Sequence, residues 1–211
     1  SYHKLARKAA ANSAVLLKND EDILPLKAGT KVALRGPFVD KPRYQGSGSS
    51  QVNSTKVEKV SEVIGNYNLE VVEDPREADV VLYFFGLDEI AESEGADRMS
   101  MDIPEYQVKE LKKLIALNKN IVGVMSAGSA VKMPWLDNLK ALLHGYLTGQ
   151  AGASALLDII TGKTVPTGKL SESYPFSYTD CSIVNFSADD TRNLQYREGP
   201  FIGYRYYDTA G

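Results

Sequence analysis

The chain has 211 residues, of which 43% are hydrophobic and 24% are charged, and its formal net charge is −3 at pH 7. This composition is typical of a globular protein that is long enough to bury a core. The small negative charge leaves no basic footprint for nucleic acid, and no apolar run approaches the ~20 residues of a membrane span. The single Cys181 excludes an internal disulfide and gives no zinc pattern. We therefore expect a soluble protein, cytoplasmic or secreted, with no membrane or nucleic-acid partner.

Apolar periodicity predicts alternating helices and strands over most of the chain. A capping box of Thr55 and Glu58 is expected to begin the second helix. The expected elements, in chain order, are a helix at 3–17, a strand at 31–35, a helix at 55–65, strands at 69–72 and 78–85, a helix at 104–117, strands at 121–125 and 141–146, a helix at 152–160 and a final extended segment that begins at 168–170 and ends at 174–175.

Strands that alternate with helices at this spacing predict an α/β fold, built from βαβ units with a mostly parallel sheet. The continuous apolar run at 78–85 indicates a strand that is covered on both faces. We expect one α/β domain at 1–176, followed by an irregular tail at 177–211. The tail contains an aromatic cluster, Tyr204, Tyr206 and Tyr207, whose alternation favours a strand or a turn.

One loop, Ala91–Arg98, carries four charged residues directly after the most strand-like run of the chain. In an open α/β sheet, ligands bind in the loops beyond the carboxyl ends of the strands. Glycoside hydrolysis needs two carboxyl groups that flank one bond. Glu92 and Glu94 are too close in sequence to be assumed to lie on opposite sides of a sugar. If this chain carries out that chemistry, the loop would supply only one of the two carboxyl groups. A solvated acidic turn is the alternative interpretation.

The remaining motifs do not complete a known pattern. Gly46–Ser50 suggests a phosphate-binding loop, but Gln51 stands where the third glycine of the dinucleotide fingerprint is required. We expect instead a hydroxyl-rich loop that lies against a polar ligand or another domain, and no cofactor or metal. The segment at 126–129 is not a nucleophile elbow, and His3 and His144 do not have the spacing of a catalytic triad. His144 is expected to be a hydrogen-bonded core residue.

Several motifs nevertheless occur in a fixed order over nearly the whole chain. They include Val15-Leu16-Leu17-Lys18-Asn19, Leu24-Pro25-Leu26, Gly46-Ser47-Gly48-Ser49, Glu94-Gly95-Ala96-Asp97-Arg98, Ile103-Pro104, Gly128-Ser129, Pro134-Trp135, Pro166-Thr167-Gly168-Lys169-Leu170 and Gly203-Tyr204-Arg205-Tyr206-Tyr207-Asp208. In this order they resemble the second, C-terminal-type domain of glycoside hydrolase family 3, whose members are β-glucosidase-like enzymes. An ordered set of motifs is much more specific than any one of them.

The resemblance implies a three-layer α/β/α sandwich with a mostly parallel six-stranded sheet and an antiparallel last strand. It also implies a retaining, exo-acting β-glycosidase that acts on a β-linked glucoside or oligosaccharide. This domain would supply the general acid/base and part of the sugar-binding cleft. The aspartate nucleophile would belong to a barrel domain that is missing from the 211 residues, so we expect the chain alone to be inactive.

The resemblance assigns roles to particular residues of the charged loop. The Glu-Gly-x-Asp-Arg motif makes Glu94 the general acid/base, and Asp97 and Arg98 would orient the loop or bind substrate. Glu92 is the alternative acid/base, because the placement of this residue varies within the family. Further substrate-binding candidates in the hydroxyl-rich loop are Gln45, Ser47 and Ser49. A flavodoxin-like ligand-binding module or a non-catalytic scaffold is the alternative function.

Overall fold

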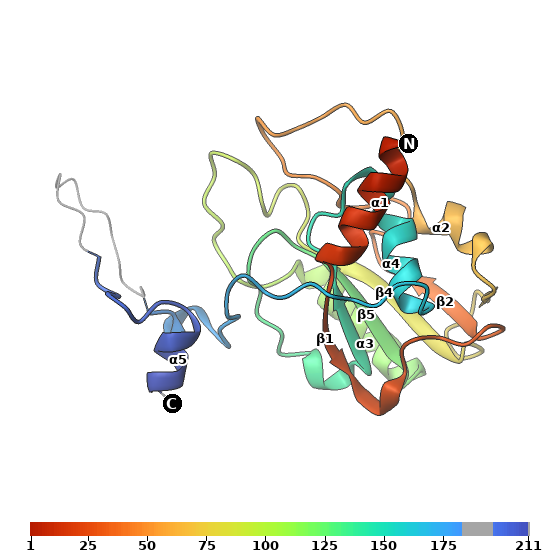
Figure 1. Cartoon of the computed structure of the whole chain (residues 1–211). Helices are drawn as coiled ribbons and strands as arrows, with labels where there is room; N and C mark the ends of the chain where they lie inside the picture. The colour runs from red at the N-terminus through yellow and green to blue at the C-terminus, as the bar shows by residue number, and fades with distance from the viewer. Residues whose placement is uncertain (183–195, 211) are drawn as a thin grey trace.

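The structure, a computed structural model, describes residues 1–182 and 196–210. Figure 1 shows an α/β sandwich from which a C-terminal segment projects to one side. The helices are α1 (Tyr2–Ser13), α2 (Val60–Val63), α3 (Glu105–Leu117), α4 (Gly152–Ile160) and α5 (Tyr204–Ala210), and the strands are β1 (Val15–Asn19), β2 (Lys31–Arg35), β3 (Glu70–Val71), β4 (Val80–Gly86), β5 (Ile121–Ser126) and β6 (Ala141–His144).

The six strands form one mixed sheet in the order β1-β6-β5-β4-β2-β3. All neighbouring pairs are parallel except β1 and β6, which are antiparallel. The predicted six-stranded, mostly parallel α/β sheet is therefore confirmed. Its single antiparallel strand, however, is the first strand of the chain and not the last, and the segment at 168–170 forms no strand.

The sheet is buried on both faces because apolar residues occupy successive positions of its central strands. All seven residues of β4 are buried, and side chains on a strand point alternately to opposite faces. Leu82 and Phe84 pack into the core under α1, α2 and α4, whereas Tyr83 and Phe85 pack into the core on the α3 side. This arrangement is the predicted three-layer sandwich.

Local expectations were wrong where a short apolar run fits two periodicities. The predicted helix at 3–17 ends at Ser13, because Ala14 is extended and the run from Val15 continues as edge strand β1. The clustered Tyr204, Tyr206 and Tyr207 of the tail lie on helix α5 and not on a strand or a turn. The stretch of the predicted tail at 183–195 lies outside the described residues.

The predicted helix cap at Thr55 is also wrong, because α2 begins only at Val60. Glu58 does not cap this helix. Its carboxylate is buried and accepts hydrogen bonds from the Ser154 backbone amide and from His3. The residue therefore ties α1 to α4 and not α2 to its own first turn.

A second polar contact fixes α1 against α4. The Arg7 guanidinium donates two hydrogen bonds of 2.6 Å to the two carboxylate oxygens of Asp158, a mostly buried residue of α4. Tyr67 joins the pair by donating to Asp158 and to the Ser154 carbonyl. The pair is buried on the Asp158 side only, because the Arg7 side chain is 38% exposed, so water can replace part of a lost contact.

We expect Asp158→Ala to destabilise the chain by about 1–2 kcal/mol, since it removes both hydrogen bonds that the partly exposed Arg7 guanidinium makes to this carboxylate and one acceptor of the Tyr67 hydroxyl. Chemical denaturation followed by circular dichroism measures this change. Asp74→Ala is the matched control, because Asp74 makes a similar two-oxygen pair with Arg76 on the surface and its loss should change stability little. Equal effects of the two substitutions would contradict the account.

Candidate functional site

The charged loop lies at the carboxyl edge of the sheet, between the end of β4 and the start of α3. β4 and β5 approach so closely there that a Cβ on Gly86 would lie 1.9 Å from the Ser126 carbonyl oxygen, and the φ of Gly86 is +140°. Only glycine fits this position. Asp88, just before the loop, accepts hydrogen bonds from the Ile90 and Ala91 backbone amides and so turns the chain into it.

Glu92 connects the loop to the segment that follows β5. Its Oε2 accepts a hydrogen bond of 2.8 Å from the Gly128 amide, and its Oε1 accepts one of 2.5 Å from the Ser129 hydroxyl. Its backbone carbonyl also accepts a hydrogen bond from the buried Arg43 guanidinium. Both carboxylate oxygens of Glu92 are thus engaged within the domain.

Glu94 lies further along the loop and is exposed. Its Oε2 alone accepts two hydrogen bonds, one from the Ser49 hydroxyl and one of 2.5 Å from the Ser49 amide. The Glu94 amide donates to the Ser47 carbonyl, which joins the charged loop to the hydroxyl-rich loop. These Ser49 donors favour the charged carboxylate and lower the pKa of Glu94 below the usual value for glutamate.

The approach of these two loops also depends on a glycine. Gly48 has a φ of +114°, and a Cβ there would lie 2.5 Å from the Cβ of Glu94. A larger residue at this position would therefore push the hydroxyl-rich loop away from the carboxylate.

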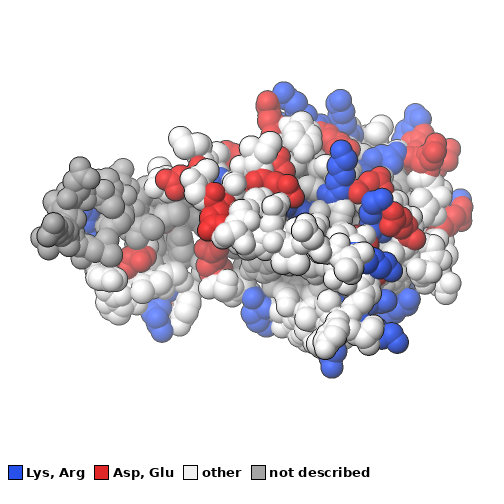
Figure 2. Space-filling view, turned by 90° about the horizontal axis from the view of Figure 1, so that it is seen from above, with Lys and Arg blue, Asp and Glu red and all other residues white. Residues whose placement is uncertain are grey.

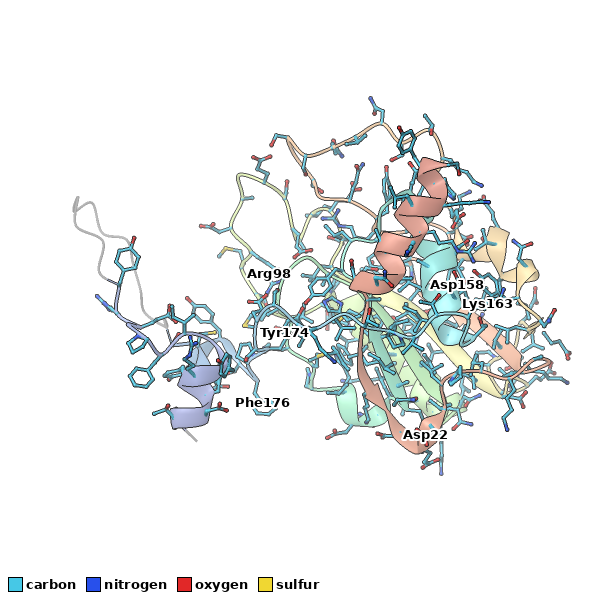
Figure 3. The ribbon with its side chains drawn as sticks, in the orientation of Figure 1. Asp22, Arg98, Asp158, Lys163, Tyr174 and Phe176 are labelled. Carbon is cyan, nitrogen blue, oxygen red and sulfur yellow. The ribbon has the colours of Figure 1, made fainter. Side chains whose placement is uncertain are left out.

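Arg98 holds the far end of the charged loop. Its guanidinium donates to the Ser129 hydroxyl at 2.8 Å and to the Ala130 carbonyl. The Ser129 hydroxyl therefore accepts from Arg98 while it donates to Glu92. Figure 3 shows Arg98 on the side of the sandwich from which the C-terminal segment leaves. In Figure 2, the acidic side chains on that side have few lysines or arginines among them, whereas both signs are interspersed at the opposite end of the sandwich.

The structure brings most of the predicted site residues together, with two exceptions. The side chain of Gln45 is occupied within its own loop, because it donates to the Tyr44 hydroxyl and accepts from the Val52 amide. Asp97 is exposed to solvent. Its carboxylate has no side-chain partner in the described part of the chain. Ser47 and Ser49, in contrast, both contact Glu94.

Sequence reasoning missed Arg43 and Ser129. Arg43 is only 4% exposed, yet it is a single arginine between Pro42 and Tyr44 and no motif marks it. Ser129 was part of a rejected nucleophile elbow and of the Gly128-Ser129 motif, but no role was assigned to it, whereas in the structure its hydroxyl holds Glu92 and Arg98.

His144 is the hydrogen-bonded core residue that the sequence predicted. It is fully buried, its Nδ1 faces the Met125 carbonyl at 3.3 Å, and its Nε2 lies 2.8 Å from the Tyr174 hydroxyl. A carbonyl can only accept, so Nδ1 donates and Nε2 of the neutral ring accepts from Tyr174. Burial lowers the pKa of His144 to about 4, although the nearby Glu92 charge opposes this shift. The imidazole is therefore neutral at pH 7.

Two observations on the described residues concern metal binding and membrane insertion. Within residues 1–182 and 196–210, no group of three histidine, cysteine, aspartate or glutamate side chains is placed to hold a metal ion. Across the same residues, no helix has the length and apolar character that crossing a bilayer requires.

The charged loop lies at the carboxyl edge of the sheet, which is where ligands bind in open α/β sheets. The model of the glycosyl hydrolase family 3 C-terminal domain matches residues 14–204. The chain therefore belongs to glycoside hydrolase family 3, and it corresponds to the C-terminal domain of that family's enzymes.

Individual relatives agree with this assignment. The whole chain is 43% identical to part of thermostable β-glucosidase B of Acetivibrio thermocellus and 39% identical to part of an exo-α-(1→6)-L-arabinopyranosidase of Bifidobacterium breve. It spans 31% and 32% of these proteins. The crystal structure of a family 3 β-glucosidase of Bifidobacterium adolescentis covers 98% of the chain with a TM-score of 0.89 at 42% identity, and the match spans 34% of that protein.

The geometry predicts how Glu94 titrates. Its pKa should lie below the usual value for glutamate, and Ser49→Ala should raise it because one of the two donors to the carboxylate is lost. Carboxyl carbon shifts in an NMR pH titration of the chain measure both values. Ser50→Ala, in the same loop, is the control that should leave the pKa unchanged. A Glu94 midpoint at or above the usual glutamate value would contradict this assignment of contacts.

Proposed function

We propose that this chain supplies the general acid/base of a retaining, exo-acting β-glycosidase, and that Glu94 is that residue. The observation that carries the proposal is the difference between the two carboxylates of the loop. Glu92 has both oxygens bound by donors of its own domain, whereas Glu94 is exposed and uses only Oε2. Glu94 is therefore the one with an oxygen available to a glycosidic bond.

In the first step of this reaction, the protonated carboxyl of Glu94 gives its proton to the leaving-group oxygen. A nucleophilic carboxylate attacks the anomeric carbon from the other side and forms a glycosyl-enzyme. In the second step, the Glu94 carboxylate takes a proton from the attacking water, and the bond to the nucleophile breaks. We propose that an aspartate of a separate barrel domain of the same parent protein supplies the nucleophile.

The lowered pKa of Glu94 supports the proposal of a partner domain. A general acid must hold its proton near neutral pH, but the Ser49 donors favour the carboxylate. Burial under a second domain and a second carboxylate nearby both raise a carboxyl pKa. Retaining enzymes place their two carboxyls only about 5–5.5 Å apart, so docking of the barrel domain would provide both effects.

We propose a β-linked glucoside or oligosaccharide as the substrate. The relatives support the class of reaction more strongly than the sugar, because one is named a β-glucosidase and another an arabinopyranosidase. The remaining predicted residues divide by role. Arg98 and Glu92 position the loop through Ser129, whereas Ser47, Ser49 and the exposed Asp97 are the candidates for direct contact with the sugar or with the partner domain.

Glu94→Gln in the parent polypeptide should lower kcat for an alkyl β-glucoside, a poor leaving group, by roughly 10²–10⁴-fold. The same substitution should slow the first step far less with dinitrophenyl β-glucoside, because this leaving group departs without a proton. Added azide should restore turnover of the activated substrate by replacing the missing base. Glu77→Gln, which changes an exposed glutamate that precedes β4, is the matched control.

Glu92→Gln distinguishes the alternative. We expect it to lower activity through a displaced loop, with no rescue by azide. Azide rescue of Glu92→Gln alone would transfer the role of acid/base to Glu92, and full activity of both variants toward alkyl glucosides would indicate a non-catalytic domain.

A further inference from the structure

The hydroxyl-rich loop is the tip of a longer segment, residues 44–58, whose two ends meet at one short turn. At the first end, the Tyr44 carbonyl accepts a hydrogen bond of 2.8 Å from the Gly149 amide. At the second end, the Glu58 amide donates one of 3.0 Å to the Gln150 carbonyl. Two successive residues of the turn that leads into α4 therefore hold both ends of the segment.

Steric constraints fix the shape of this turn. Gly149 has a φ of +68°, a conformation that favours glycine. A Cβ on Gly152, the first residue of α4, would lie 1.8 Å from the Thr148 hydroxyl oxygen. All nine residues of α4 are buried, so the turn continues directly into an element of the core. The base of the segment thus rests on a part of the fold that has little freedom to move.

Three side chains from distant parts of the sequence join at this base. The Glu58 carboxylate is only 7% exposed, and it accepts hydrogen bonds of 3.1 Å from the Ser154 amide and of 2.7 Å from Nε2 of His3. Nδ1 of His3 accepts one of 2.7 Å from the Gln150 side-chain amide. In Figure 1 the segment is the orange arch that returns beside the N-terminus of α1, where Glu58 meets His3.

The imidazole of His3 therefore bridges the end of the segment to the turn. Although burial of Glu58 opposes its charge, the hydrogen bonds from Ser154 and His3 lower the pKa of Glu58 below the usual value for glutamate. The carboxylate is charged at pH 7. A buried charge that loses a donor is costly, so removal of the imidazole would weaken the base of the segment.

The tip of the same segment holds the carboxylate of Glu94. Ser49 donates to this carboxylate from its hydroxyl and its amide, and the Ser47 carbonyl accepts from the Glu94 amide. Residues 48–53 are all exposed, so this part of the segment is not packed into the core. The place of Ser49 relative to Glu94 therefore depends on how firmly the base is held.

We propose that His3, Glu58 and Gln150 are positioning residues of the candidate site, which fix the base of the segment and, through Ser49, the orientation of the Glu94 carboxylate. The part of Glu94 in catalysis rests on the proposed function, whereas the connection between His3 and the tip of the segment does not. Helix α1, which contributes no group to the site itself, would in this way help to set the position of the acid/base.

The test is the titration of Glu94 in His3→Phe, which keeps an aromatic ring but removes both hydrogen bonds of the imidazole. A loosened segment withdraws the two Ser49 donors, so the pKa of Glu94 should rise toward the usual value for glutamate, as it should in Ser49→Ala. Carboxyl carbon shifts in an NMR pH titration of the chain measure this midpoint.

Arg7→Met is the matched control for a general loosening of α1. Arg7 makes the other polar contact between α1 and α4, and its partners are Asp158 and Tyr67. This variant should lower stability but leave the Glu94 midpoint unchanged. An equal rise of the midpoint in Arg7→Met and His3→Phe would overturn the proposal.

Substitutions of the half-buried Gln150 provide a second measurement that does not alter α1. Gln150→Leu should raise the Glu94 midpoint as His3→Phe does, because Nδ1 of His3 loses its partner. Gln150→Glu should leave it low, since a carboxylate can accept from a protonated imidazole. If His3→Phe does not fold, Gln150→Leu decides. A midpoint that stays at its original value in the folded variants would overturn the proposal.

In the parent polypeptide, His3→Phe should lower kcat for an alkyl β-glucoside by roughly 10–100-fold through the displaced carboxyl group, and change KM much less. Arg7→Met should keep both constants. The NMR titration needs no barrel domain and no substrate. A raised Glu94 midpoint together with unchanged kcat would therefore contradict the role of Glu94 in the proposed function, while the positioning by His3 would stand.

Discussion

The arrangement of the candidate site depends on the hydrogen bonds that hold one acidic loop to two neighbouring loops. Ser129, after β5, donates to Glu92 and accepts from Arg98, and Ser49 donates to Glu94. None of these contacts is strong alone, since a net hydrogen bond contributes only about 0.5–1.5 kcal/mol, or somewhat more to a charged group. Together they fix two carboxylates with different environments on a loop of eight residues.

This difference in environment is what separates the roles of the two glutamates. Glu92 is saturated by its own domain, and Glu94 is exposed on one oxygen. The same Ser49 donors that hold Glu94 also lower its pKa, which is the wrong direction for a general acid. On our proposal the domain is therefore half of a site, since it positions the carboxyl group and a second domain must supply the burial and charge that protonate it.

The elements that the sequence predicted well are those with long, unambiguous patterns. The seven residues of β4 form one continuous apolar run, and the thirteen residues of α3 follow the helical period. Each pattern is long enough to indicate one type of element. The strand at Val15–Asn19 was missed because it follows the first helix directly. Its first three residues are apolar and were therefore assigned to the apolar face of that helix. Glu58 was assigned to a local cap because its true partners, His3 and Ser154, are distant in sequence.

Prediction of the site from sequence was limited in the same way, by contacts between residues that are distant in the chain. The family motif identified Glu94, Asp97 and Arg98 as a group, but their environments depend on pairs that are 31–45 residues apart. No local signal distinguishes the saturated Glu92 from the exposed Glu94. Arg43 belongs to no motif. Its guanidinium is buried and holds the Glu92 carbonyl through Nη2, while Nε and Nη1 have no partner among the described residues, and only the folded chain shows this.

The most direct measurement of the central claim is the hydrolysis of an aryl β-glucoside by this chain alone and after addition of the remainder of its parent polypeptide. The account predicts no hydrolysis by the chain alone and activity when both parts are present, because each part carries one of the two carboxyls. Hydrolysis by the chain alone would contradict it, since the 211 residues would then contain both the acid/base and the nucleophile.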